Sequence, residues 1–213
     1  MARARHYVIP FAIFLFFTEL ARHLPEKAHF LYVAKTLIVG ALLFSWRRLY
    51  TEIWIPTHWR NILLALGSGL LVLLVWIGAE GLPTLGSGRG FSPFRFGLSA
   101  EMAVLLAGIR LAGSAVVVPV MEELFWRSFF MRYLIRSDFE KVPLGTYTHF
   151  SFWMVVFLFA LEHYRILPAL FAGVVYGGLV CYSKNIRVPI FSHAVTNLGL
   201  GIYVLLTERW EFW

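Results

Sequence analysis

Apolar runs separated by short basic turns make up most of this 213-residue chain. The runs cover residues 7–20, 30–46, 62–77, 100–135, 150–161, 167–182 and 188–206. Several approach the roughly 20 apolar residues that an α-helix needs to cross a bilayer. The pattern therefore predicts an all-α, polytopic integral membrane protein with seven or eight transmembrane helices.

The fourth run is the reason for the range of seven to eight. As one straight helix, residues 100–135 would extend for roughly 54 Å, which is too long for a single crossing. Pro119 lies within this run and cannot donate a backbone hydrogen bond. We therefore expect the run to be kinked at Pro119 or split there into two helices.

Composition and charge agree with a membrane protein, since 59% of residues are hydrophobic and only 15% are charged. The net charge of +7 comes from basic residues that mostly lie between the runs. Basic residues between membrane helices are typical of membrane topology, so the charge predicts no nucleic-acid partner. Their distribution slightly favours a cytoplasmic amino terminus.

The single cysteine, Cys181, excludes an internal disulfide and a Cys-x-x-Cys site. The length predicts one membrane domain over 1–213, with motif-free helices in 1–95 and the chemistry in 100–206.

Two adjacent carboxylates and an arginine stand inside the fourth run, as Glu122, Glu123 and Arg127. Ionisable groups at membrane depth are costly, so a function is the default interpretation. On a helix, Glu123 and Arg127 are four residues apart and can pair. Glu122 lies about 100° round the helix and has no such local counter-ion. A buried carboxylate without a partner can act as a general base near neutral pH.

Two further polar groups occur in the later runs. His163 follows the run 150–161, and His193 and Asn197 lie on one face of the last run, four residues apart. Histidine and asparagine can donate hydrogen bonds to a developing oxyanion. With Glu122 as base, these residues could hydrolyse an amide without a metal ion. Each also has a structural interpretation: an ion-pair clamp, a histidine at a helix end, and hydrogen bonds between helices.

Other hydrolase chemistries are excluded by missing residues. Asp138 is the only aspartate, so a two-aspartate mechanism is impossible. The chain contains neither His-Glu-x-x-His nor Gly-x-Ser-x-Gly. A mechanism centred on glutamate remains.

The polar groups form three motifs that resemble one family: the type II, Ras-converting CAAX prenyl endopeptidases and their prokaryotic relatives, the CAAX proteases and bacteriocin-processing enzymes. The motifs are Glu122-Glu123-x-x-x-Arg127, Phe159-x-x-x-His163 and His193-x-x-x-Asn197, in the family's order, within residues 116–199. The resemblance implies an intramembrane glutamate endopeptidase. In it, Glu122 and His163 would activate water, and His193 and Asn197 would hold the oxyanion. Glu123, Arg127 and Phe159 would support these catalytic residues.

The resemblance further implies a membrane-associated protein or peptide as substrate, with a prenylated CAAX-type substrate as one option. It implies neither a cofactor nor a metal. Two alternatives stay open: a zinc-dependent version of the same protease, and a non-catalytic immunity, scaffold or transport protein that uses the same polar cavity. A compact chain of this kind is expected in the plasma membrane of a prokaryote.

Overall fold

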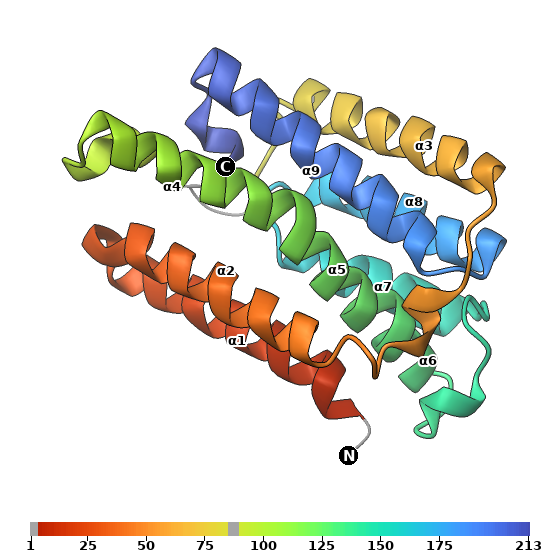
Figure 1. Cartoon of the computed structure of the whole chain (residues 1–213). Coiled ribbons are helices and arrows are strands. Elements are labelled where there is room, and N and C mark those ends of the chain that lie inside the picture. The colour runs from red at the N-terminus through yellow and green to blue at the C-terminus, as the bar shows by residue number, and fades with distance from the viewer. Residues whose placement is uncertain (1–3, 85–89) are drawn as a thin grey trace.

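The computed structural model describes residues 4–84 and 90–213, and this part of the chain is built from helices, with no β-strand (Figure 1). The helices are α1 (Arg5–His23), α2 (Ala28–Ser45), α3 (Trp59–Gly78), α4 (Ala100–Ala112), α5 (Val118–Glu123), α6 (Met131–Tyr133), α7 (His149–Leu161), α8 (Ile166–Ser183) and α9 (Arg187–Thr207). The predicted all-α fold is confirmed.

Five of the helical segments described are long and apolar enough to cross a membrane: Pro25–Ser45, Trp59–Gly78, Ala100–Tyr133, Ile166–Ser183 and Arg187–Thr207. α7 is apolar, but its 13 residues extend only about 20 Å. α1 carries Glu19 and Arg22 in its last turns and is not among the five. The chain is an integral membrane protein, and the predicted count of seven or eight crossings is not confirmed.

The segment Ala100–Tyr133 is one continuous helical rod that joins α4, α5 and α6 and passes through Pro119. Of the two expected arrangements, the split into two helices is therefore wrong, and the kink at Pro119 stays a prediction. Gly113–Val117 form a π-helical segment just before Pro119, and Leu124–Phe130 form a second one after the two glutamates. A π segment shifts the backbone hydrogen-bond register by one residue. The helix can therefore continue past Pro119, which has no amide hydrogen to donate. The second π segment contains no proline, so the sequence carried no signal for it.

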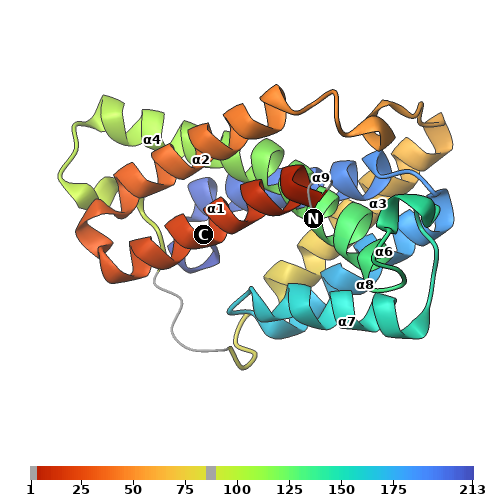
Figure 2. The ribbon, with the colours of Figure 1, turned by 90° about the horizontal axis from the view of Figure 1, so that it is seen from below.

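The rod lies between two helix pairs, α1 with α2 and α3 with α9 (Figure 1). α7 packs on α8, which in turn contacts α3 and α9 (Figure 2). The first half of the chain therefore contributes directly to the packing of the second half.

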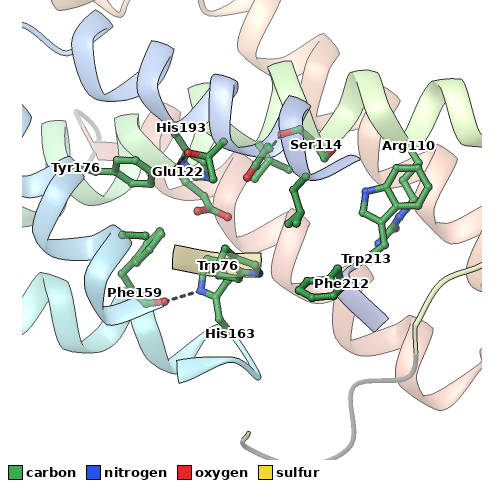
Figure 3. Close-up of a pocket in the computed structure, with 15 residues that line it drawn as sticks. Trp76, Arg110, Ser114, Glu122, Phe159, His163, Tyr176, His193, Phe212 and Trp213 are labelled. Atoms are coloured by element: carbon green, nitrogen blue, oxygen red, sulfur yellow. Dashed lines mark hydrogen bonds between the residues drawn. The ribbon is translucent and has the colours of Figure 1, made fainter. Parts of the chain in front are cut away.

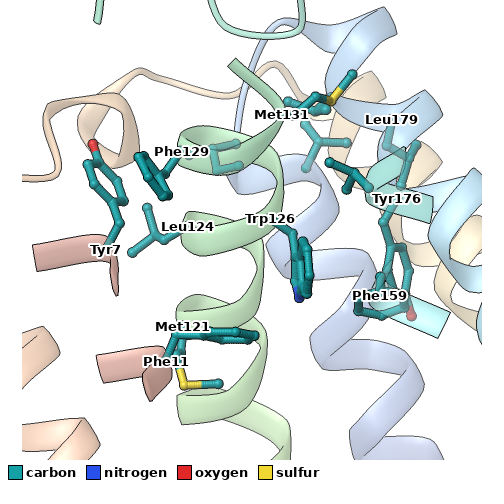
Figure 4. Close-up of a cluster of buried hydrophobic side chains, with 14 of the residues drawn as sticks. Tyr7, Phe11, Met121, Leu124, Trp126, Phe129, Met131, Phe159, Tyr176 and Leu179 are labelled. Atoms are coloured by element: carbon teal, nitrogen blue, oxygen red, sulfur yellow. The ribbon is translucent and has the colours of Figure 1, made fainter. Parts of the chain in front are cut away.

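Aromatic side chains fix the rod in the bundle where its second π segment begins (Figure 4). Phe11 of α1 stacks on Phe125, with ring centroids 3.8 Å apart and planes 6° apart. Trp126 and Phe129 are both buried, Trp126 against Phe159 and Phe129 against Tyr7. Stacked and edge-to-face pairs of this kind each add about 0.5–1.5 kcal/mol beyond simple burial.

Small residues let α3 and α9 approach closely. Thr196 Oγ1 donates a hydrogen bond of 2.9 Å to the Gly69 carbonyl, and the hydroxyl oxygens of Ser68 and Ser192 lie 3.0 Å apart. A Cβ atom at Gly69 would lie 2.5 Å from the Ser192 carbonyl oxygen, whereas one at Gly67 would meet nothing within 4 Å. Of these two glycines, only Gly69 is required by the helix contact.

This contrast gives a matched pair of variants. We expect Gly69→Ala to destabilise the protein by about 1–3 kcal/mol, because the added methyl group has no room. Gly67→Ala should be neutral or slightly stabilising, because alanine favours helix more than glycine does. Thermal unfolding of both variants in detergent measures the difference, and equal melting temperatures would contradict close packing at Gly69.

Candidate active site

A cavity of about 170 Å³ opens between the rod, α8, α9 and the turn that joins α7 to α8. All four residues predicted to be catalytic line it, although they come from three separate segments: Glu122, His163, His193 and Asn197 (Figure 3). The structure thus brings together side chains up to 75 positions apart in the sequence, since Glu122 and Asn197 share the cavity.

The two adjacent glutamates have different surroundings. Glu122 is 6% exposed, and its Oε2 has no hydrogen-bond partner in the described part of the chain. Its carboxylate points toward the same space as Trp76 and His163 (Figure 3). Glu123 is fully buried, and its Oε1 accepts hydrogen bonds from Arg127 Nη1 at 3.2 Å and from His193 Nδ1 at 3.0 Å. Of the two, only Glu122 lines the cavity and is available to a ligand, while Glu123 holds two structural partners through its Oε1.

Arg127 is buried behind the cavity and does not line it. Its guanidinium lies over the ring of Phe159, 4.2 Å from the centroid, and 5.6 Å from that of Tyr176. Cation–π contacts of this kind partly compensate a cation for lost hydration. Phe159 also packs against the ring of His163, with centroids 4.9 Å apart. Glu123 and Phe159 thus contact the candidate catalytic histidines, and Arg127 contacts both of these supporting residues.

The orientation of His163 is fixed by its own helix end. Its Nδ1 lies 2.9 Å from the Phe159 carbonyl oxygen, which can only accept, so we assign the proton to Nδ1. In the neutral ring, Nε2 is then the free acceptor. Burial lowers the pKa of His163 to about 4, so the ring is neutral at pH 7.

His193 is held on several sides. Its Nδ1 donates to Glu123, and its ring stacks on Tyr176 with centroids 4.8 Å apart and planes 18° apart. The Tyr176 hydroxyl in turn donates to Thr196 Oγ1 at 2.9 Å. Asn197 Nδ2 donates to the Ser114 carbonyl oxygen at 2.9 Å, which leaves one amide hydrogen for a ligand.

Sequence reasoning missed several residues near the site. Tyr176 and Trp76 line the cavity, but each lies in an apolar run where an aromatic residue carries no signal. Glu162 accepts a hydrogen bond from Trp126 Nε1 at 3.0 Å, and burial raises the pKa of its carboxyl to about 7. The position of Glu162 next to His163 in the sequence could have indicated that it lies near the site. Arg110 also lines the cavity. It lies four residues before Ser114 in the sequence, a spacing that places both residues on one face of a helix.

Within residues 4–84 and 90–213, no three His, Cys, Asp or Glu side chains are grouped so that they could hold a metal ion. A zinc ion bound by Glu122, His163 and His193 would therefore require these side chains to move. The zinc-dependent alternative makes its own prediction, sensitivity to a chelator.

Comparison with known proteins gave one family. Residues 104–199 match the family model described as Type II CAAX prenyl endopeptidase Rce1-like. The matched range begins in α4, ends in α9 and contains all three motifs. No curated protein and no solved structure gave a significant match.

Proposed function

We propose that this chain, whose residues 104–199 belong to the Type II CAAX prenyl endopeptidase Rce1-like family, is a membrane endopeptidase that uses a glutamate-activated water molecule. The family supports peptide-bond cleavage in the membrane. The mechanism rests on one observation: Glu122, His163, His193 and Asn197 line the same cavity.

Glu122 is the best candidate for the general base. Its side chain lines the cavity, and none of the described residues hydrogen-bonds to its carboxylate, so a water molecule in the cavity can serve as its partner. Glu122 would remove a proton from this water as the water oxygen attacks the substrate carbonyl carbon. His163 Nε2 is free to accept the water's other hydrogen, which would orient a lone pair toward the carbonyl carbon. General-base catalysis of this kind contributes about 10²–10⁴-fold in rate.

His193 and Asn197 are suited to stabilise the resulting oxyanion. Asn197 directs one amide hydrogen to the Ser114 carbonyl, which orients the other as a donor. His193 directs Nδ1–H to Glu123, so in the proposed mechanism its Nε2 donates to the oxyanion as part of an imidazolium, in which both ring nitrogens carry a hydrogen. Donors fixed in this way need no rearrangement as negative charge develops, and one such donor is worth about 10²–10³-fold in kcat. Collapse of the tetrahedral intermediate breaks the C–N bond, and the proton held by Glu122 passes to the leaving amine.

The substrate we propose is a membrane-associated protein or peptide, with a prenylated CAAX-type carboxyl end as the leading option, cleaved without a cofactor. We place the enzyme in a prokaryotic plasma membrane with a cytoplasmic amino terminus, as one domain. Seven crossings would require α1 and α7 to cross the bilayer beside the five longer segments. No eighth crossing remains in the described part of the chain, because Ala100–Tyr133 form a single segment.

The first test is cleavage of a farnesylated CAAX reporter peptide, and of its unprenylated form, by the purified protein in detergent. Each reaction is run with and without 1,10-phenanthroline, and Glu122→Gln protein serves as the blank. We expect cleavage that survives the chelator. Chelator-sensitive cleavage would favour zinc, and failure to cleave either peptide would contradict the proposed activity and favour a binding role.

A further inference from the structure

A second charged side chain lines the same cavity as Glu122. Arg110 lies on α4, and the positions at intervals of four along the rod all line the cavity: Arg110, Ser114, Val118 and Glu122. One face of one helical rod therefore carries both charged residues. Figure 3 shows Arg110 and Trp213 at the end of the group opposite to Glu122.

Arg110 has no anionic partner in the described structure. Its guanidinium lies 4.5 Å, 4.3 Å and 5.1 Å from the ring centroids of Tyr32, Phe91 and Trp213. Among the described residues its side chain makes no hydrogen bond, and its Nε is buried without a partner. Aromatic faces offset part of the cost of dehydrating a cation but leave its N–H groups unsatisfied. The site is complementary to a ligand with oxygen acceptors and negative charge.

A carboxylate fits this site best. A guanidinium binds a carboxylate through two parallel N–H···O bonds, and such bonds strengthen where water is excluded. A lipid phosphate is a poorer fit, because Arg110 is ten residues, or about 15 Å, along the rod from Ala100.

The spacing along the rod limits the length of the bound peptide. Twelve residues separate Arg110 from Glu122, which corresponds to at most about 18 Å at 1.5 Å per residue. An extended peptide covers about 3.3–3.6 Å per residue. A carboxylate at Arg110 and a scissile carbonyl at Glu122 would therefore be separated by about five residues.

We propose that Arg110 binds the free C-terminal carboxylate of the substrate and so selects peptide bonds close to the carboxyl end. This inference rests on the proposed function, because it assigns the specificity of the same cavity. Arg110 would act in binding, whereas Glu122 acts in the chemical step.

The test compares two reporter peptides that differ only at the carboxyl end, one with a free acid and one with an amide. The parent protein should cleave the acid with a kcat/KM at least about tenfold higher, mainly through a lower KM. In Arg110→Gln the acid-to-amide ratio should fall to about one. Because both peptides are assayed on the same preparation, any unfolded fraction cancels from the ratio. Arg136→Gln, at an exposed arginine outside the cavity, should keep the parent ratio.

The outcomes separate the two proposals. If the parent cleaves neither peptide, the proposed function fails. If it cleaves both equally, or if Arg110→Gln keeps the preference for the acid, the assignment of Arg110 is overturned while the protease remains. Inhibition by phosphatidylglycerol that depends on Arg110, without any acid preference, would identify a lipid phosphate and equally overturn the assignment.

Discussion

Glu122→Gln is expected to lower kcat for peptide cleavage by about 10³-fold or more, while the protein stays folded. Glutamine has the size of glutamate but cannot accept a proton from water at neutral pH. The change also removes a buried negative charge whose Oε2 has no hydrogen-bond partner in the described structure, so the fold loses no visible contact. Thermal unfolding in detergent should show a melting temperature equal to or above that of the parent.

The matched control is Glu26→Gln, which makes the same chemical change at an exposed position outside the cavity. Cleavage of the reporter peptide is measured as single turnovers, so that slow product release does not hide the chemical step. Glu26→Gln should retain the parent rate. Full cleavage activity in Glu122→Gln would rule out this carboxylate as the base.

Much of the fold could be predicted because the signals are local. The last three helices begin and end within a residue or two of the predicted runs, since basic or polar residues such as Arg165 and Lys184 separate them. The contact between Glu123 and Arg127 likewise follows from four-residue spacing on one helix. The π segment Leu124–Phe130 has no such marker, and its geometry depends on packing against α1 and α7.

Contacts between distant segments were beyond sequence reasoning. The hydrogen bond from His193 to Glu123 joins residues 70 positions apart, and only the packing of α9 on the rod creates it. Because of this bond, the carboxylate that pairs with Arg127 also orients a candidate oxyanion donor. Stability and catalysis should therefore be coupled at Glu123.

Arg127→Leu should lower the free energy of unfolding by about 3–5 kcal/mol, because it leaves Glu123 as a buried charge without its cation. Both side chains are fully buried in an ion pair of 3.2 Å. The guanidinium also fills the space over Phe159. Cleavage should fall as well, since an unpaired Glu123 would draw His193 toward it. Thermal unfolding and reporter cleavage in the same detergent measure the two effects.

The double variant Glu123→Gln/Arg127→Leu separates charge from packing. Glutamine can still accept the hydrogen bond from His193 Nδ1, and no isolated charge remains, so the double variant should regain much of the lost stability. Cleavage should recover less than stability does, because a neutral amide orients and polarises His193 more weakly than a carboxylate. If Arg127→Leu alone proves as stable as the parent, the Glu123–Arg127 pair is not a clamp. If instead the double variant stays as unstable as Arg127→Leu, the lost packing of the guanidinium on Phe159 accounts for the destabilisation.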